Sequence, residues 1–224
     1  MKEVKVLNIS YDKFISRYQN VQIPDYQRPY RWNQDKVKDL LDDLREFFIE
    51  KPTPNLEYYI GGILLYNNKK ENCYEVIDGQ QRLTTLNLIS FILTGELQDG
   101  QNLQYNNHIS FYHIKENHQY LREQIELLQS LNGKDFFKKL VFTLIISNDE
   151  DQSFAFFDSQ NNRGVTLGAD DYLKAYHLRE VSSESLQSAL AEQWEQAAIR
   201  AQNEMNNERG LVHLFYKILY RSRQ

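Results

Sequence analysis

The 224-residue chain contains a single cysteine, Cys73, and carries a formal net charge of −5 at pH 7. One cysteine excludes an intramolecular disulfide and any metal site built on two thiolates. A negative net charge argues against a protein held on nucleic acid by bulk positive charge, so any DNA contact needs a local basic patch. The chain also lacks a signal-peptide pattern and an apolar run long enough to span a membrane, which predicts a cytoplasmic protein with no membrane partner.

Several familiar motifs of nucleotide and metal chemistry are also missing. The Gly133-Lys134 pair lacks the upstream glycine of a P-loop, and neither the H-E-x-x-H motif nor the glycine-rich dinucleotide fingerprint occurs. His108, His113 and His118 recur every five residues, a spacing that fits neither a helical face nor a strand face. Loop and surface histidines are therefore a simpler interpretation of these residues than a metal site.

The residues that are present predict an α+β protein with a substantial core. The chain is 41% hydrophobic and 13% aromatic. Apolar residues at helical spacing follow Asn33, which is placed to cap that helix. Residues 58–66 and 73–77 are typical of a β-hairpin, and an apolar helix follows over residues 81–93. A buried strand is predicted at residues 140–146 among segments that are mostly helical. Further helices are predicted over residues 170–181, 185–205 and 208–220.

The hairpin meets the apolar helix at the sequence D-G-Q-Q-R. The backbone N–H groups of Gly79, Gln80 and Gln81 are expected to face out of the helix start, and such an end attracts anions. Gly79 permits a positive φ or a close approach of the backbone to a ligand. Arg82 adds a guanidinium fork that matches a phosphate, and a glutamine amide is able to orient an attacking water. The corner therefore predicts an anion site, although these features alone do not establish a hydrolase.

Asp78 has two interpretations, because a carboxylate beside a phosphate repels it. Asp78 is either the N-cap of the helix or a ligand of a Mg²⁺ ion that lies between carboxylate and phosphate. Spacing alone favours the cap, since Asp-Gly before a helix is a common turn.

The segment I-P-D-Y-Q-R-P-Y-R-W interleaves aromatic rings with guanidinium groups. Tyr26, Tyr30 and Trp32 alternate with Arg28 and Arg31 on a stretch that its two prolines keep extended. Such a segment suits base stacking or contact with a DNA backbone. It is equally typical of a strap whose aromatic rings cover the core and whose arginines pair with the acidic helix that follows.

Four blocks of the sequence together resemble a known family. The blocks IPDYQRPYRW, YYIGGILL, VIDGQQRLTTL and FDSQNNRGVTLGADDYLKA occur in this order between residues 23 and 175. They resemble the N-terminal domain of GmrSD-type, modification-dependent restriction proteins, which is also found in phosphorothioate-sensing SspE-like proteins. The resemblance implies a small ParB/sulfiredoxin-like mixed sheet packed against helices, with a mainly helical C-terminal extension. We therefore expect an α/β core over residues 1–95 and a helical part over residues 96–224, packed on the core as one unit.

The resemblance also implies a nucleoside triphosphatase that requires Mg²⁺ and senses modified or foreign DNA. With the resemblance included, a functional role for Asp78 is favoured over a cap. The matching catalytic residues are Asp78, Gln81 and Arg82, with Asp78 also the metal ligand. The expected nucleotide-binding residues are Gln27, Arg28, Gly79, Gln80, Asn161, Arg163, Gly164 and Lys174. The expected DNA-sensing residues are Tyr26, Tyr30, Arg31 and Trp32.

One departure from the family leaves the activity open. Full-length relatives usually continue into an HNH-type nuclease domain, and His177 and His213 lack the partners that such a site requires. Either the chain is part of a longer protein, or the nuclease is a separate subunit; assembly into a homo-oligomer is also left open. The alternative to a triphosphatase is a nucleotide- or DNA-binding switch without turnover that regulates a partner nuclease. DNA nicking by a ParB-like nuclease is a weaker alternative, because no carboxylate cluster accompanies Asp78.

Overall fold

The computed structural model describes residues 4–53, 55–96, 101–161, 169–181 and 183–204. The contacts divide the chain into a first unit of residues 1–23 and 30–157, and a second unit of residues 24–29 and 158–224. This division differs from the predicted boundary at residue 95. The reason is that the strand at Leu140–Ser147 pairs within the sheet of the first unit. The helices between residue 95 and this strand therefore belong to the first unit as well.

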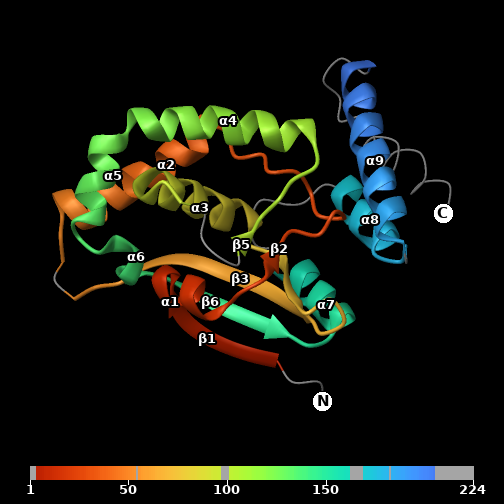
Figure 1. Cartoon of the computed structure of the whole chain (residues 1–224), viewed down its shortest axis with the longest axis horizontal. Helices are drawn as coiled ribbons and strands as arrows, with labels where there is room; N and C mark the ends of the chain where they lie inside the picture. Colours follow the sequence, from red (N-terminus) through yellow and green to blue (C-terminus); the bar gives the residue numbers. More distant parts are fainter. Residues whose placement is uncertain (1–3, 54, 97–100, 162–168, 182, 205–224) are drawn as a thin grey trace. The chain divides into compact units, whose positions relative to one another are not determined.

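Figure 1 shows the described helices and strands in chain order. Those of the first unit are β1 (Val4–Ser10), α1 (Tyr11–Arg17), β2 (Val21–Gln22), α2 (Gln34–Arg45), the π-helical turn η1 (Glu46–Glu50), β3 (Tyr58–Asn68), β4 (Cys73–Asp78), α3 (Gln80–Thr94), β5 (Gln101–Asn102), α4 (His108–Glu123), α5 (Ile125–Asn132), α6 (Phe136–Lys139) and β6 (Leu140–Ser147). Helix α7 (Glu150–Asn161) begins in the first unit and ends in the second. The second unit contains α8 (Ala169–Leu178) and α9 (Glu184–Glu204).

The strands of the described residues form one mixed sheet of six, in the order β1-β6-β3-β4-β2-β5. Strand β6 pairs antiparallel with β1 and parallel with β3, and the hairpin partners β3 and β4 are antiparallel. The two-residue strands β2 and β5 extend the other edge in parallel. The predicted α+β class, with a mixed sheet packed against helices, is confirmed, as are the hairpin and the buried strand β6.

Helix α3 is the central helix of the first unit, as its apolar circumference predicts. It lies between the sheet and α4 (Figure 1), and Leu83, Leu86 and Ile89 are fully buried. Because α3 is buried on most of its sides, the position of its first turn is fixed by packing. The D-G-Q-Q-R corner is therefore carried on a rigid part of the fold.

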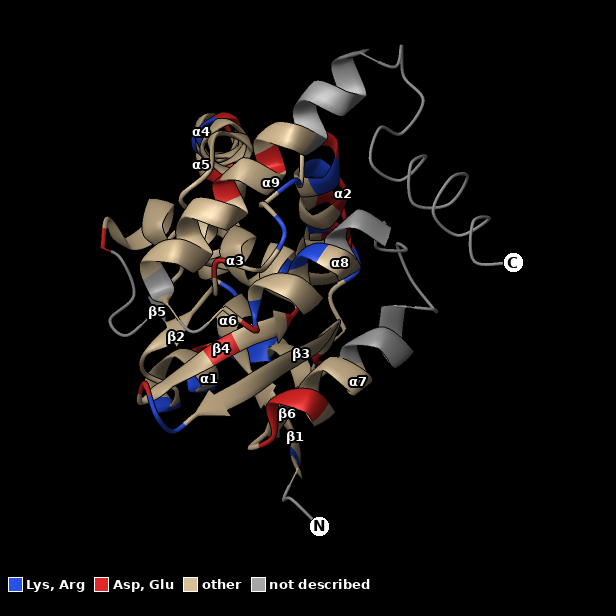
Figure 2. Cartoon of the chain, turned by 90° about the vertical axis from the view of Figure 1, so that its right-hand side faces the viewer, with Lys and Arg blue, Asp and Glu red and all other residues tan. Residues whose placement is uncertain are grey.

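Helix α2 is amphipathic, as predicted. The side chain of Asn33 caps it by accepting a hydrogen bond from the Lys36 backbone N–H at 3.1 Å. Its outward face carries both acidic and basic residues (Figure 2), which pair with one another along the helix. The described pairs on this helix include Lys36 with Asp39, Lys38 with Asp42, and Arg45 with Asp42.

Other expectations from the sequence have mixed outcomes. Cys73 is buried, as predicted, and its sulfur accepts a hydrogen bond from the side-chain amide of Gln22. The three regularly spaced histidines lie on helix α4 and not in loops; His108 is exposed, as predicted, while His113 and His118 are half-buried. The predicted helix over residues 208–220 lies outside the described residues. None of the described helices combines the length and apolar character that crossing a bilayer requires.

Candidate functional site

The D-G-Q-Q-R corner is a tight strand-to-helix turn in which Gly79 occupies the N-cap position of α3. Gly79 has φ 90° and ψ 4°, a left-handed conformation that favours glycine. A Cβ atom at this position would also lie 2.8 Å from Cγ1 of Ile63 and 3.1 Å from the Gly62 carbonyl oxygen. The interpretation of Asp78 as the N-cap is therefore wrong, because the cap residue is the glycine that follows it.

The start of α3 is covered in this structure. Gly79 is buried, and Gln80 and Gln81 are only 4% and 7% exposed. The prediction of three exposed backbone amides at residues 79–81 is therefore wrong. Any anion site at this corner must be formed by the residues that flank the buried turn.

Both glutamines of the motif tie other segments to the helix. The side-chain oxygen of Gln81 accepts hydrogen bonds from the backbone N–H groups of Arg31 at 2.8 Å and Trp32 at 3.0 Å. Gln80 hydrogen-bonds the hydroxyl of Tyr105, a buried residue of the segment between β5 and α4. The Gln81 side-chain oxygen therefore holds the Arg31–Trp32 backbone against the start of α3, and the predicted orientation of water by Gln81 stays a prediction.

Asp78 and Arg82 are the members of the motif that reach the surface. Their side chains are 33% and 25% exposed, and Nη2 of Arg82 lies 3.7 Å from Oδ2 of Asp78. That separation is an ion-pair distance and is longer than a direct hydrogen bond. Nη1 of Arg82 donates to the Ile60 carbonyl oxygen at 3.0 Å, which fixes one side of the guanidinium group.

The guanidinium of Arg82 rests on Gly61 of β3. Strand β3 is irregular here, since its register against β6 shifts between Tyr59 and Gly62. Gly61 has φ +107°, and a Cβ atom at this position would overlap Nη1 of Arg82. Sequence reasoning missed this role, although a glycine inside a strand often marks a bulge or a close approach. The Y-I-G-G and D-G-Q-Q-R motifs are thus two parts of one arrangement.

Gly61→Ala is expected to displace the Arg82 side chain without altering any functional group. Any ligand that Arg82 binds is then expected to bind at least about tenfold more weakly, which corresponds to one lost charge-assisted hydrogen bond of about 1.5–3 kcal/mol. The control is Gly62→Ala, whose Cβ would meet only the Thr143 carbonyl oxygen at an ordinary 3.8 Å. Titration of both variants with nucleotide gives their affinities. Equal nucleotide affinities of Gly61→Ala and Gly62→Ala would show that Gly61 does not position the Arg82 guanidinium for a ligand.

Tyr30 is an interior residue of the first unit. It is fully buried, and its hydroxyl bonds Thr85 at 2.8 Å and accepts a hydrogen bond from Asn117 at 3.0 Å. Burial raises its pKa, while the hydrogen bonds to Thr85 and Asn117 act in the opposite direction. Tyr26, in the second unit, is 4% exposed. The prediction that these two rings sense DNA is not supported, because neither ring offers a surface.

Arg31 is exposed and Trp32 is half-buried against the core of the first unit. Burial and, after it, the positive charge of Arg31 lower the pKa of His113 on α4. Arg31 is thus a surface cation near α4, and its predicted contact with DNA stays a prediction.

Lys174, predicted to face the nucleotide, instead forms a buried ion pair within the second unit. Its side chain is 2% exposed, its Nζ lies 2.8 Å from Oε1 of Glu195, and it donates to the Gln27 carbonyl oxygen at 3.0 Å. A hydrogen bond between Ser188 and Asp25 joins α9 to the same short segment. The ammonium of Lys174 is therefore occupied by protein partners, and Glu195 is a structural residue that sequence reasoning did not identify.

The remaining predicted nucleotide-binding residues are Gln27, Arg28, Asn161, Arg163 and Gly164. Gln27 is 8% exposed, and Arg28 is half-buried. The side chain of Asn161 and the whole of Arg163 and Gly164 lie outside the described residues. Their predicted roles therefore stay predictions.

Asp78 is the residue through which a Mg²⁺ ion was predicted to bind. Among the described residues, no group of three or more histidine, cysteine, aspartate or glutamate side chains is arranged to hold a metal ion. Mg²⁺ in nucleotide sites is usually held by one or two carboxylates, with phosphate oxygens and water completing its shell. A single, partly exposed carboxylate fits that mode of binding and does not fit a metal held by the protein alone.

The chain thus forms an α+β fold in which an acidic and a basic side chain, Asp78 and Arg82, form an ion pair at a strand-to-helix turn. Residues 11–178 match the model of the family described as GmrSD restriction endonuclease, N-terminal domain. Because the match covers most of the 224 residues, the chain belongs to this family. Membership places the chain in a restriction system, a form of defence against foreign DNA. No match to a curated protein was found.

Proposed function

We propose that the chain is the sensor domain of a modification-dependent restriction system and hydrolyses nucleoside triphosphates. The observation that carries the proposal is the Asp78–Arg82 pair, which is partly exposed and held at 3.7 Å beside a buried, rigid turn. An ion pair at the surface contributes only about 0–1 kcal/mol. A phosphate that engages the guanidinium therefore disrupts little of the folded structure.

The two side chains have complementary roles toward a triphosphate. Arg82 is held by its hydrogen bond to Ile60 and by its seat on Gly61, so its remaining donors are oriented before a phosphate arrives. A guanidinium fixed in this way stabilises the charge that develops on the transferred phosphoryl group. Asp78 would hold Mg²⁺, which when bound neutralises charge on the phosphate oxygens. In this arrangement Asp78 would bind the metal and Arg82 would bind the phosphate.

The proposed reaction is hydrolysis of the terminal phosphoanhydride. A water oxygen forms a bond to the γ-phosphorus, and the bond from that phosphorus to the β–γ bridging oxygen breaks. The water proton leaves to the phosphate products or to solvent, so the products are a nucleoside diphosphate and inorganic phosphate. Arg82 acts here by electrostatic stabilisation and Asp78 by positioning the metal; neither residue forms a covalent bond.

Phosphate release tests the proposal directly. The purified chain is incubated with GTP, UTP, CTP or ATP and Mg²⁺, with and without modified DNA. Release above that of a heat-denatured control supports a triphosphatase, and stimulation by modified DNA supports the sensor role. No release with any of the four nucleotides, in either condition, would contradict hydrolysis by this chain.

A nucleotide-binding switch without turnover is the second candidate. The observation that favours it is the engagement of the Gln81 oxygen by the Arg31 and Trp32 amides, because an oxygen that holds two backbone groups is not available to a water. In that case the bound nucleotide would change the conformation of the domain and regulate an HNH-type nuclease domain or subunit. Saturable binding of nucleotide without any product distinguishes this candidate from the enzyme.

Gln81→Met separates a positioning role from a catalytic one. The variant removes the shared acceptor of two backbone N–H groups, so the free energy of unfolding is expected to fall by about 2 kcal/mol. A catalytic glutamine at the surface would leave stability unchanged on substitution. Chemical denaturation provides the measurement, with Gln119→Met as the control because Gln119 is an exposed residue of α4. Equal stability of both variants would contradict the positioning role.

A further inference from the structure

Helix α4 presents surface cations that have no acidic partner among the described residues. Lys115 and Arg122 are exposed, and in the part of the chain that the structure describes neither forms an ion pair. The exposed lysines of α2 differ, because Lys36 pairs with Asp39 and Lys38 pairs with Asp42. Cations without a protein partner are available to an external anion at lower cost than cations that must first leave a carboxylate.

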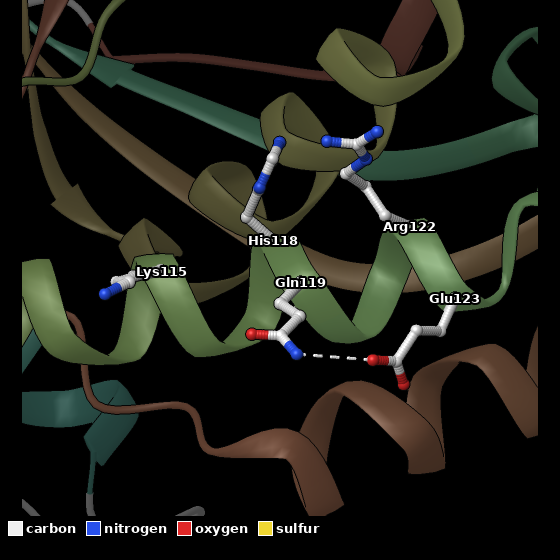
Figure 3. Close-up of a pocket in the computed structure, with 5 residues that line it drawn as sticks. All are labelled: Lys115, His118, Gln119, Arg122 and Glu123. Carbon is white, nitrogen blue, oxygen red and sulfur yellow. Dashed lines mark hydrogen bonds between the residues drawn. The ribbon is translucent and has the colours of Figure 1, made fainter.

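These cations share one face of α4 with a histidine and an aromatic ring. At 3.6 residues per turn, Phe111, Lys115, His118 and Arg122 fall within roughly 60° of arc around the helix axis. Figure 3 shows His118 and Arg122 directed to one side of α4, while Gln119 and Glu123 are directed to the other side. Glu123 accepts a hydrogen bond from Gln119 at 3.4 Å, so the described partner of this carboxylate is a neutral amide of α4.

The surroundings of this face favour a polyanion. The neighbouring helix α3 contains no aspartate or glutamate, and its Phe91 contacts the ring of His118 at 6.0 Å between centroids. Lys115, His118, Gln119, Arg122 and Glu123 line a hollow of about 420 Å³ on α4, so the hollow contains two cations and one carboxylate. Phe111, one turn before Lys115, is 61% exposed. The face therefore combines positive charge, a concave surface and an aromatic ring.

We propose that this face of α4, comprising Phe111, Lys115, His118 and Arg122, is a surface that contacts the phosphate backbone of duplex DNA. The choice of DNA as the polyanion rests on the restriction role of the chain. A membrane surface does not fit, because a helix that enters lipid needs an outward apolar face. In α4 the inward face is already packed, as the burial of Ser110, Asn117 and Leu121 shows.

The spacing of the cations matches the repeat of a DNA strand. Lys115 and Arg122 are seven residues apart, which corresponds to about 10 Å along the helix axis. Successive phosphates of one strand rise by about 3.4 Å along the duplex axis, so the two side chains are able to reach phosphates about three steps apart. Such contacts position the protein on DNA without reading its sequence. They provide the local patch that a chain of net charge −5 needs for DNA binding.

The test is a titration of a short, fluorescently labelled DNA duplex with the full chain over a series of salt concentrations. The variant Lys115→Gln/Arg122→Gln removes the two exposed cations. Loss of two phosphate contacts is expected to weaken binding roughly tenfold or more and to reduce the slope of log K against log salt by about 2. The charge-matched control is Lys36→Gln/Lys38→Gln, which lowers the net charge equally and is expected to bind as the wild type does. Lys115→Arg/Arg122→Lys keeps both charges and is expected to retain affinity.

Three results would overturn the proposal. One is equal DNA affinity and salt slope in the two glutamine double variants, the second is the absence of DNA binding by the wild-type chain, and the third is binding to phosphatidylglycerol vesicles but not to DNA. Triphosphate turnover measured without DNA is expected to be unchanged in all variants, because none of these residues lies at the Asp78–Arg82 corner. Failure of the triphosphatase proposal is therefore visible separately, as an inactive wild-type chain that still binds DNA through α4.

Discussion

Replacing Arg82 with alanine is expected to lower nucleoside-triphosphate turnover by about a hundredfold or more, because removal of one charge-stabilising group raises the barrier by roughly 3 kcal/mol. Asp78→Ala is expected to have a comparable effect through loss of the metal ligand. The folded state is expected to change little, since the pair is partly exposed and an exposed pair contributes about 0–1 kcal/mol. Phosphate release at saturating nucleotide, together with thermal melts, measures both quantities.

A second arginine–aspartate pair offers a matched control. Nη2 of Arg45 lies 3.0 Å from Oδ1 of Asp42 on α2, and both side chains are partly exposed. Arg45→Ala therefore removes an arginine from a similar pair away from the D-G-Q-Q-R corner. Its turnover is expected to equal that of the wild type. If Arg82→Ala and Arg45→Ala retained the same activity, Arg82 would have no role in the reaction.

Glu195→Ala is expected to destabilise the second unit by about 3–5 kcal/mol, because it leaves the ammonium of Lys174 buried without its carboxylate partner. The chain has two tryptophans, so a Trp32→Phe background leaves Trp194, the neighbour of Glu195 on α9, as the sole tryptophan reporter. Urea unfolding followed by the fluorescence of Trp194 then gives the loss of stability of this part of the chain.

Glu192 provides the control on the same helix. Its carboxylate is exposed and accepts only a hydrogen bond from Gln196 at 3.2 Å, so Glu192→Ala is expected to change stability by less than about 0.5 kcal/mol. The double variant Lys174→Met/Glu195→Leu replaces the buried ion pair with apolar groups and is expected to recover most of the stability. Comparable unfolding of Glu195→Ala and Glu192→Ala would show that the Lys174–Glu195 pair does not stabilise the unit.

Much of the fold was predictable because the strongest local patterns agree with the tertiary structure. The cap at Asn33, the apolar spacing of α2 and the hairpin of β3 and β4 are local features, and each is confirmed. The division of the chain was not predictable in this way. It depends on β6 pairing with β1 and β3, strands that lie far away in the sequence, and on residues 24–29 joining the second unit.

The sequence predicted which residues form the candidate site, but it predicted only part of their arrangement in space. The motif pointed to the right corner, but spacing does not show which of its side chains are enclosed. The side-chain oxygen of Gln81 accepts hydrogen bonds from backbone N–H groups some fifty positions earlier in the chain. Lys174 forms an ion pair with Glu195 on another helix. Both contacts arise from tertiary packing. The seat of Arg82 on Gly61 joins two motifs whose connection the sequence does not reveal.

A crystal structure of the chain with a nonhydrolysable triphosphate and Mg²⁺ is the most direct test of the central claim that Asp78 and Arg82 face the nucleotide. The account predicts a phosphate oxygen within hydrogen-bonding distance of the Arg82 guanidinium and the metal about 2.1 Å from an Asp78 carboxylate oxygen. A nucleotide bound elsewhere on the chain, with the Asp78–Arg82 pair unchanged, would contradict it.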